Sequence, residues 1–240
     1  MRRVVIVTPS VYGPDNSATL AGMKARGKYA RGVAVIDNRT APCELETMQD
    51  AGIAGIRLNL NTGGNNNDPN IGRERFQAAV KRVRDLKWHI QIYTNLATIK
   101  SIKDLVMTSP VPVVFDHFGG AKGNLGVDQP GFADLLDLVR SGKAYVKISG
   151  AYRSSTEAPT YADMTPLAKA LIAANDERIV WGTDWPHPNS APPKERPVGE
   201  VTPLFQIDDG QLMNQLAAWA PGAATRKNIL VDNPEELYGF

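Results

Sequence analysis

Cysteine is almost absent from this chain: Cys43 is the only one among 240 residues. A single thiol excludes an intrachain disulfide and a cysteine-rich zinc site, and it is typical of a reducing compartment. The sequence also lacks any apolar run of roughly 18 residues or more, which excludes a membrane-spanning helix. The apolar stretch that follows Arg2 and Arg3 is too short for the core of a signal peptide. We therefore expect a soluble, cytoplasmic protein that does not bind membranes.

A strong charge of one sign is also missing. The formal net charge is +2, from 27 Lys and Arg against 25 Asp and Glu. Nucleic acid is therefore not an expected partner, because a duplex is bound by a strongly basic face. Hydrophobic residues make up 42% of the chain and charged residues 22%, which is ordinary globular composition and excludes disorder. We expect a single domain over residues 1–240.

Short β-branched runs alternate with helical patterns along the whole chain. The predicted strands are Val4–Thr8, Gly32–Ile36, Gly55–Asn61, Trp88–Thr94, Val113–His117, Tyr145–Gly150 and Ile179–Asp184. The predicted helices are Ala18–Tyr29, Pro42–Asp50, Gly72–Leu86, Thr98–Thr108, Gly131–Ser141, Tyr161–Asn175 and Gly210–Ala220. Such regular alternation predicts parallel strands joined by right-handed crossovers.

The interiors of these strands favour a closed barrel over an open sheet. In the strand at 145–150, the apolar Val146 and Ile148 alternate with the polar Lys147 and Ser149. An open sheet covered on both faces would show near-continuous apolar runs, whereas a barrel can carry polar groups inside. No glycine-rich phosphate loop follows any strand. The predicted fold class is therefore α/β, a TIM-type (β/α)8 barrel.

The predicted strands number seven, one fewer than this barrel requires. The last strand is followed by a proline-rich loop, a helix and a segment typical of a C-terminal end. We therefore expect strands two to eight of the barrel to be present. Strand one and its helix, a unit of roughly 30 residues, would be missing from the chain.

Catalytic groups of such barrels lie at the C-terminal ends of the strands, where two candidates stand out. Asp184 ends the strand at 179–184 and could take a proton from an attacking water. Its alternative role is a helix cap or an ion pair. His117 ends the strand at 113–117 and could donate to an oxyanion or hold a metal, although a lone histidine is often structural.

Two arginines are expected to face one cavity from opposite sides of the barrel. Arg57 lies on the strand at 55–61, and Arg153 follows the strand at 145–150. Paired guanidinium groups suggest an anionic substrate, and structural ion pairs with Asp184 or Asp116 are the alternative. Tyr93 could contact the same substrate or simply cap the core.

Four further polar residues need separate interpretations. Asn59 shares the inward parity of Arg57 and is a candidate for substrate binding. His187 lies in the loop after the last strand and could contact substrate or belong to the loop alone. Lys147 is expected to pair with a carboxylate, and His89 to serve stability at the bottom of the barrel.

At these strand ends the sequence resembles the amidohydrolase superfamily, in its branch of metal-independent lactone hydrolases. The resemblance is carried by Asp-His-Phe-Gly at 116–119 and Trp-Gly-Thr-Asp-Trp-Pro-His-Pro at 181–188. It implies that Asp184 is the general base on the hydrolytic water and that His117 lies near the scissile carbonyl. It also implies that Arg57, Tyr93 and Arg153 hold the carboxylate and carbonyl oxygens of the substrate.

Two features depart from that family pattern. The family's first strand carries an Asp-x-His-x-His element, whereas the three histidines here are at 89, 117 and 187. The missing motif agrees with the missing strand. Glycines and asparagines at 63–67 also stand where a pyrone-dicarboxylate hydrolase has a further cation, so a second carboxylate on the substrate is not required.

We therefore predict a hydrolase of a small, carboxylate-bearing lactone or similar cyclic ester, without a cofactor. One alternative is a metal-dependent hydrolase or decarboxylase in which His117 and Asp184 help to hold Zn²⁺ or Mn²⁺. Another is a truncated, non-catalytic family member. Its unpaired strand edges would favour a homodimer or aggregation.

Overall fold

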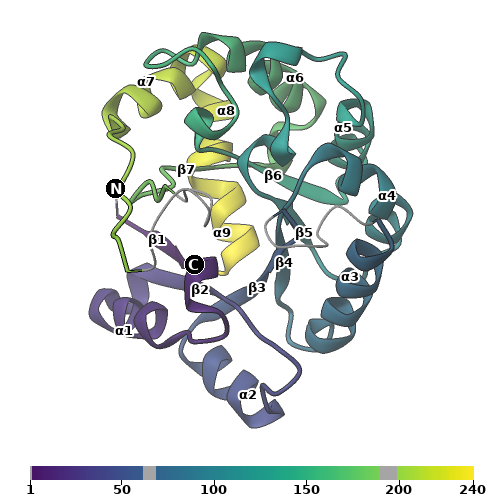
Figure 1. Cartoon of the computed structure of the whole chain (residues 1–240), viewed down its shortest axis with the longest axis vertical. Coiled ribbons are helices and arrows are strands. Elements are labelled where there is room, and N and C mark those ends of the chain that lie inside the picture. The colour runs from purple at the N-terminus through teal and green to yellow at the C-terminus, as the bar shows by residue number, and fades with distance from the viewer. Residues whose placement is uncertain (1, 62–68, 190–198) are drawn as a thin grey trace.

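The computed structural model describes residues 2–61, 69–189 and 199–240. In this part of the chain, seven parallel strands form one sheet in the order β1 to β7. Figure 1 shows that the sheet curls, so that β7 comes back towards β1. The strands are β1 (Val4–Val7), β2 (Ala30–Ala34), β3 (Ile53–Asn59), β4 (His89–Tyr93), β5 (Val113–Phe115), β6 (Ala144–Ser149) and β7 (Ile179–Gly182).

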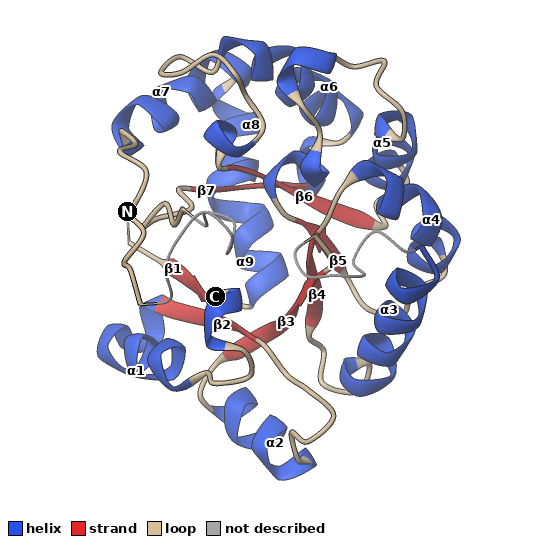
Figure 2. Ribbon diagram, viewed as in Figure 1, coloured by secondary structure: helices blue, strands red, loops and turns tan. Residues whose placement is uncertain are grey.

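Helices α1 to α8 surround the curl, as Figure 2 shows, whereas α9 lies inside it. The helices are α1 (Ser17–Arg26), α2 (Pro42–Asp50), α3 (Pro69–Val83), α4 (Leu96–Met107), α5 (Phe132–Arg140), α6 (Thr165–Ala174), α7 (Asp209–Trp219), α8 (Ala223–Lys227) and α9 (Asn233–Tyr238). A π-helical turn, Asn228–Asp232, joins α8 to α9. The parallel α/β architecture predicted from the alternation is therefore confirmed.

Every predicted strand and helix is present, with shifts at the ends. The predicted strands ran on through His117 and Asp184, but β5 ends at Phe115 and β7 at Gly182. Positive φ angles of 50° at His117 and 66° at Asp184 explain the difference, because extended backbone requires a negative φ. The short helices α8 and α9 were not predicted, since five or six residues carry too little periodicity to be seen.

The two faces of the sheet differ as the strand patterns predicted. One side-chain parity, which includes Ile92, Phe115 and Ile148, is buried in the large apolar core beneath the helices. The other parity turns to the inside of the curl, where Lys147 of β6 contacts Asp116 just after β5. The inside therefore carries polar groups that a sheet with helices on both faces would not accommodate.

Helix α9 covers the inside of the curl at the N-terminal ends of the strands. In Figure 1 it lies in the middle of the ring of strands. The ring of Tyr238 meets His89 edge-on at 5.2 Å, and Arg31 of β2 donates to the carbonyl of Gly239 at 2.6 and 3.1 Å. Asn233 ties the start of α9 to β7 by donating to the carbonyl of Ile179 at 2.7 Å. Helix α9 therefore covers the polar groups inside the curl at the N-terminal ends of the strands. A site can then form at the C-terminal ends.

None of the described helices is both long enough and apolar enough to cross a membrane.

Candidate functional site

The predicted site residues meet at the C-terminal ends of the central and last strands. His117 follows β5 and Asp184 follows β7, yet His117 Nε2 lies only 3.9 Å from Asp184 Oδ1. The ring of Tyr93, at the end of β4, meets the ring of His117 edge-on at 5.4 Å. Because the strands are parallel, their C-terminal ends share one edge, and this brings together residues that are far apart in sequence.

Gly150 makes the approach of His117 and Asp184 possible. It lies just after β6 with φ of +58°, in the left-handed region. A Cβ at this position would come within 2.9 Å of His117 Nδ1 and 3.0 Å of Asp184 Oδ2. Any larger residue would therefore push one of the two side chains aside.

The inner nitrogen of His117 is held by Ser149, the last residue of β6. Its Nδ1 lies 3.0 Å from the hydroxyl of Ser149 and 3.3 Å from the carbonyl of the same residue. Burial lowers the pKa of His117, and the charges of Asp116 and Asp184 only partly oppose this effect. The imidazole is therefore neutral near pH 7, and the group that Ser149 presents to Nδ1 decides whether Nε2 carries a proton.

The two oxygens of the Asp184 carboxylate have different surroundings. Oδ2 accepts a hydrogen bond of 2.6 Å from the hydroxyl of Tyr152 and one of 2.5 Å from Nε of Arg153. Oδ1 faces His117. Arg153 also donates to the carbonyl of Pro188 at 3.1 Å, which fixes its guanidinium at the edge of the site.

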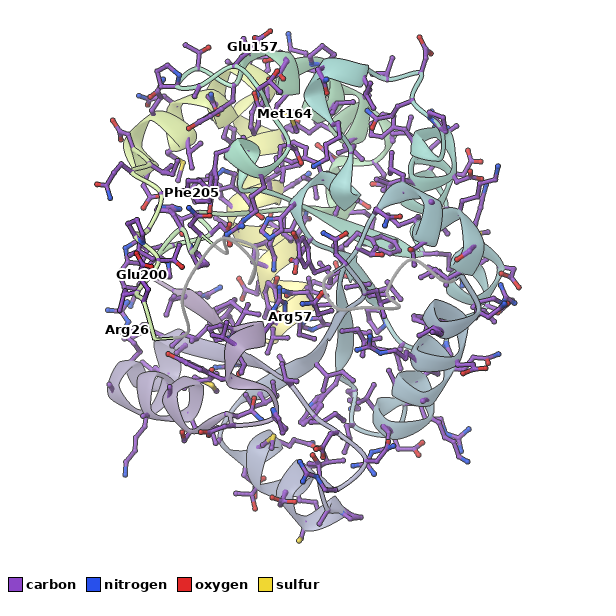
Figure 3. All side chains as sticks on the ribbon, in the orientation of Figure 1. Arg26, Arg57, Glu157, Met164, Glu200 and Phe205 are labelled. Carbon is purple, nitrogen blue, oxygen red and sulfur yellow. The ribbon has the colours of Figure 1, made fainter. Side chains whose placement is uncertain are left out.

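Arg57 occupies the β3 side of the site. Its Nη1 donates to Ser10 Oγ at 2.6 Å, and its guanidinium carbon lies 5.6 Å from the centre of the Tyr93 ring. Asn59 donates to the same Ser10 oxygen at 2.9 Å, so both predicted residues of β3 converge on one hydroxyl after β1. Figure 3 shows Arg57 near the middle of the ring of strands.

A buried ion pair forms the floor of the site. Lys147 Nζ lies 2.9 Å from Asp116 Oδ1, Gln91 donates to Asp116 Oδ2 at 2.9 Å, and Arg57 Nε lies 3.7 Å from the same oxygen. Burial alone would raise the pKa of Asp116, but the positive charges around it, of which Lys147 has the largest effect, lower it to about 2. Asp116 therefore stays ionised and balances the cations beneath the site. The prediction that Lys147 pairs with a carboxylate is confirmed.

His187 lies behind the site. Its side chain is buried, its Nε2 is 3.3 Å from Asp209 Oδ1, and its ring meets that of Tyr152 edge-on at 5.6 Å. The structure thus places it within the loop after β7, and its contact with substrate stays a prediction. His89 is buried at the start of β4, at the far end of the curl, where the sequence placed it.

The described side chains do not fit a metal ion. Within residues 2–61, 69–189 and 199–240, no group of three or more His, Cys, Asp and Glu side chains could hold one. Zinc normally takes at least three protein ligands, and here His117 and Asp184 face each other without a third. Asp184 Oδ2 is already occupied by two hydrogen-bond donors.

Three residues of the site were not singled out from the sequence. Tyr152 and Ser149 contact Asp184 and His117 directly, and Ser10 bridges Arg57 and Asn59. The position of Tyr152 beside Arg153 was a usable signal, because a turn can direct neighbouring side chains to one site. The glycine and asparagine stretch at 63–67 lies outside the described residues.

Comparisons with known proteins identify the family of the chain. The sequence model of a family described as Amidohydrolase matches residues 1–240. The chain is 34% identical over its full length to 4-sulfomuconolactone hydrolase of Hydrogenophaga intermedia, 75% of which is covered. It is 31% identical over 98% of its length to 2-pyrone-4,6-dicarboxylate hydrolase of Comamonas testosteroni, again with 75% of that protein covered. An apo crystal structure of an Agrobacterium tumefaciens protein aligns with the whole chain and 81% of its own, with a TM-score of 0.81 at 28% identity.

Proposed function

Because the chain belongs to the amidohydrolase family, we propose that it hydrolyses a small, carboxylate-bearing lactone or similar cyclic ester. Two of its relatives are named as hydrolases of such rings, 4-sulfomuconolactone and 2-pyrone-4,6-dicarboxylate. The observation that carries the proposal is the approach of His117 Nε2 to within 3.9 Å of Asp184 Oδ1 at the C-terminal edge of the sheet. A potential base and a potential donor to the carbonyl thus face one point, where water and an ester carbonyl would meet.

In the proposed reaction Asp184 acts on the water. Oδ1 accepts a proton as the water oxygen forms a bond to the carbonyl carbon of the ring. The ring C–O bond then breaks, and the leaving oxygen takes up the proton from Asp184. The products are a carboxylate and a hydroxyl on one open chain, and the released acid proton passes to solvent.

His117 stabilises the negative charge that develops on the carbonyl oxygen. This role requires a proton on Nε2, and a neutral imidazole has one there when the hydroxyl of Ser149 donates to Nδ1. The lowered pKa of His117 supports this neutral form. Ser149 therefore selects the useful tautomer in our proposal.

The cations orient the substrate. Arg57 would hold a carboxylate of the substrate together with Ser10 and Asn59. Arg57 and Asn59 both donate to the hydroxyl of Ser10. Tyr93 would contact the ring or a carbonyl oxygen from the β4 side. Arg153, held against Asp184, would place a second positive charge at the opposite edge.

None of these steps uses a metal. We infer that hydrolysis is metal-independent, and the donor set supports this inference because only two possible ligands face each other among the described residues. The metal-dependent alternative makes the opposite prediction. Under that alternative a chelator would abolish turnover, and Zn²⁺ or Mn²⁺ would restore it.

We also infer that the sheet is part of a (β/α)8 barrel. The order of the described strands leaves β1 and β7 at the edges, and the curl in Figure 1 brings these edges towards each other. One further parallel strand would pair with both edges and close the ring. The similarity to the Agrobacterium structure, with a TM-score of 0.81, supports the family fold.

The proposal is tested with a panel of lactones: 4-sulfomuconolactone, 2-pyrone-4,6-dicarboxylate, sugar-acid lactones, and an uncharged lactone as control. Products are followed by NMR, which separates ring opening from isomerisation, with and without EDTA. We expect ring opening of an anionic lactone that EDTA does not slow. A folded, monomeric protein that opens none of them would contradict the proposal, and an isomeric lactone as sole product would replace hydrolysis by isomerisation.

A further inference from the structure

The hydrogen bond from Tyr152 to Asp184 has no place in the reaction as described so far. We infer that Tyr152 is a positioning residue that makes Asp184 Oδ1, and not Oδ2, the oxygen that accepts the proton from water. This inference rests on the proposed function, because it assigns the working atom of the proposed base. Tyr152 would act through its hydrogen bond to Asp184.

The first argument is the unequal use of the two carboxylate oxygens. Oδ2 accepts from the hydroxyl of Tyr152 at 2.6 Å and from Nε of Arg153 at 2.5 Å. Two short hydrogen bonds already use this oxygen, so it is a poor acceptor for a third proton. Oδ1 is directed towards His117, 3.9 Å from Nε2, and this is the side where the carbonyl would lie.

The second argument is the local fold that brings Tyr152 to this place. Gly150 leaves β6 in the left-handed conformation, and a single 3-10 turn, Ala151–Arg153, follows it. Tyr152 and Arg153 are consecutive residues of this turn, and both reach the same carboxylate oxygen. The guanidinium carbon of Arg153 lies 5.0 Å from the centre of the Tyr152 ring, so the two donors also support each other.

The third argument is that the ring of Tyr152 is clamped. His187 meets it edge-on at 5.6 Å, and Phe205 packs against it with the ring centres 5.3 Å apart. The amide of Phe205 donates to the carbonyl of His187 at 3.0 Å, so the two clamping residues are held as one unit. Figure 3 marks Phe205 in the segment that precedes α7. This arrangement gives His187, which is buried behind the site, a role through Tyr152.

The hydroxyl of Tyr152 remains protonated and can donate a hydrogen bond. Burial and the adjacent charge of Asp184 raise the pKa of Tyr152, so the phenol stays protonated. Towards the ionised carboxylate of Asp184 the phenol can therefore only donate.

Tyr152→Phe tests the inference, because it removes the hydroxyl and keeps the ring and Arg153. With 4-sulfomuconolactone, or 2-pyrone-4,6-dicarboxylate if that ring is opened faster, we expect kcat to fall about tenfold while KM stays within about threefold. The melting temperature should fall by less than about 4 °C. Tyr145→Phe is the matched control. Tyr145 lies at the start of β6, and its hydroxyl accepts a hydrogen bond of 3.0 Å from Arg178. Loss of this hydroxyl should leave kcat unchanged.

A double variant separates positioning from a general structural effect. If Tyr152 acts through Asp184, Tyr152→Phe should cost nothing further when added to Asp184→Asn. A wild-type kcat for Tyr152→Phe, or an equal tenfold loss in both backgrounds, would overturn the inference while leaving the proposed function intact. If the wild-type chain opens no lactone, the proposed function fails and the positioning role fails with it.

Discussion

Gly150 lies against Asp184 so closely that a Cβ on the glycine would be 3.0 Å from Asp184 Oδ2. The same Cβ would be 2.9 Å from His117 Nδ1. A residue without a side chain thus packs against both the proposed base and the proposed oxyanion donor, in a conformation that favours glycine, with φ of +58°. The geometry of the proposed site therefore depends on the absence of a side chain at this position.

Gly150→Ala should therefore cost activity beyond its effect on stability. The positive φ predicts a loss of about 1 kcal/mol in the free energy of unfolding, and the collision should lower kcat by at least about tenfold. Gly239→Ala is the matched control, because Gly239 has the same left-handed conformation, with φ of +69° and ψ of 46°, and no atom within 4 Å of its would-be Cβ. We expect a similar stability loss there in urea unfolding, with normal kcat. Equal activity of the two variants would argue against a role for the close approach.

Asp184→Asn should nearly abolish turnover. An amide cannot accept the proton of water, and loss of general-base catalysis costs about 100-fold to 10,000-fold in kcat. The fold should persist, because Asn keeps the shape of the side chain. Asp85→Asn serves as the control and should behave as wild type, because the side chain of Asp85, just after α3, is 87% exposed. Turnover within a few-fold of wild type would remove Asp184 from the proposed reaction.

Ser149→Ala should lower kcat through the tautomer of His117. Without the hydroxyl, Nδ1–H would donate to the carbonyl of residue 149, and Nε2 would lose the proton that stabilises the oxyanion. We expect a loss of up to about 100-fold in kcat, since a single oxyanion donor is worth that much or more. Ser141→Ala, which removes a serine hydroxyl at the end of α5, should have no such effect. An unchanged kcat for Ser149→Ala would contradict the proposal that the hydroxyl of Ser149 selects the tautomer of His117.

His89 should make the protein sensitive to mild acid. Burial lowers the pKa of His89 to about 3, whereas an unfolded histidine titrates near 6.5. Between these values the unfolded chain binds a proton that the native protein excludes, so the free energy of unfolding falls as the pH is lowered. His89 lowers the free energy of unfolding by on the order of 3 kcal/mol as the pH falls from 6.5 to 4. Above pH 6.5 the stability is not reduced by this histidine.

Urea unfolding of wild type and His89→Leu at pH 7, 5.5 and 4.5 measures this contribution. The difference between the two curves isolates His89 from the other acid-sensitive groups, which both proteins share. We expect the variant to lose less stability than wild type as the pH falls. Parallel pH profiles would contradict the prediction.

The sequence by itself determined the order of strands and helices and the two faces of each strand. It could do so because these are local properties: a strand alternates its side chains with a period of two, so the polar positions of Lys147 and Ser149 are visible beside Val146 and Ile148. It also located His117 and Asp184 at strand ends, since catalytic groups of such folds gather there.

Only the tertiary structure decided how these groups are paired. The ion pairs of Lys147 with Asp116 and of Arg153 with Asp184 each join residues 31 positions apart, and the sequence had left several partners open for each cation. The pairing depends on strand register and on backbone angles such as the positive φ of Gly150 and Asp184, which no local pattern encodes. Packing between segments that are distant in the chain also places α9 inside the curl. In the same way it brings the loop after β7 against the ring of Tyr152.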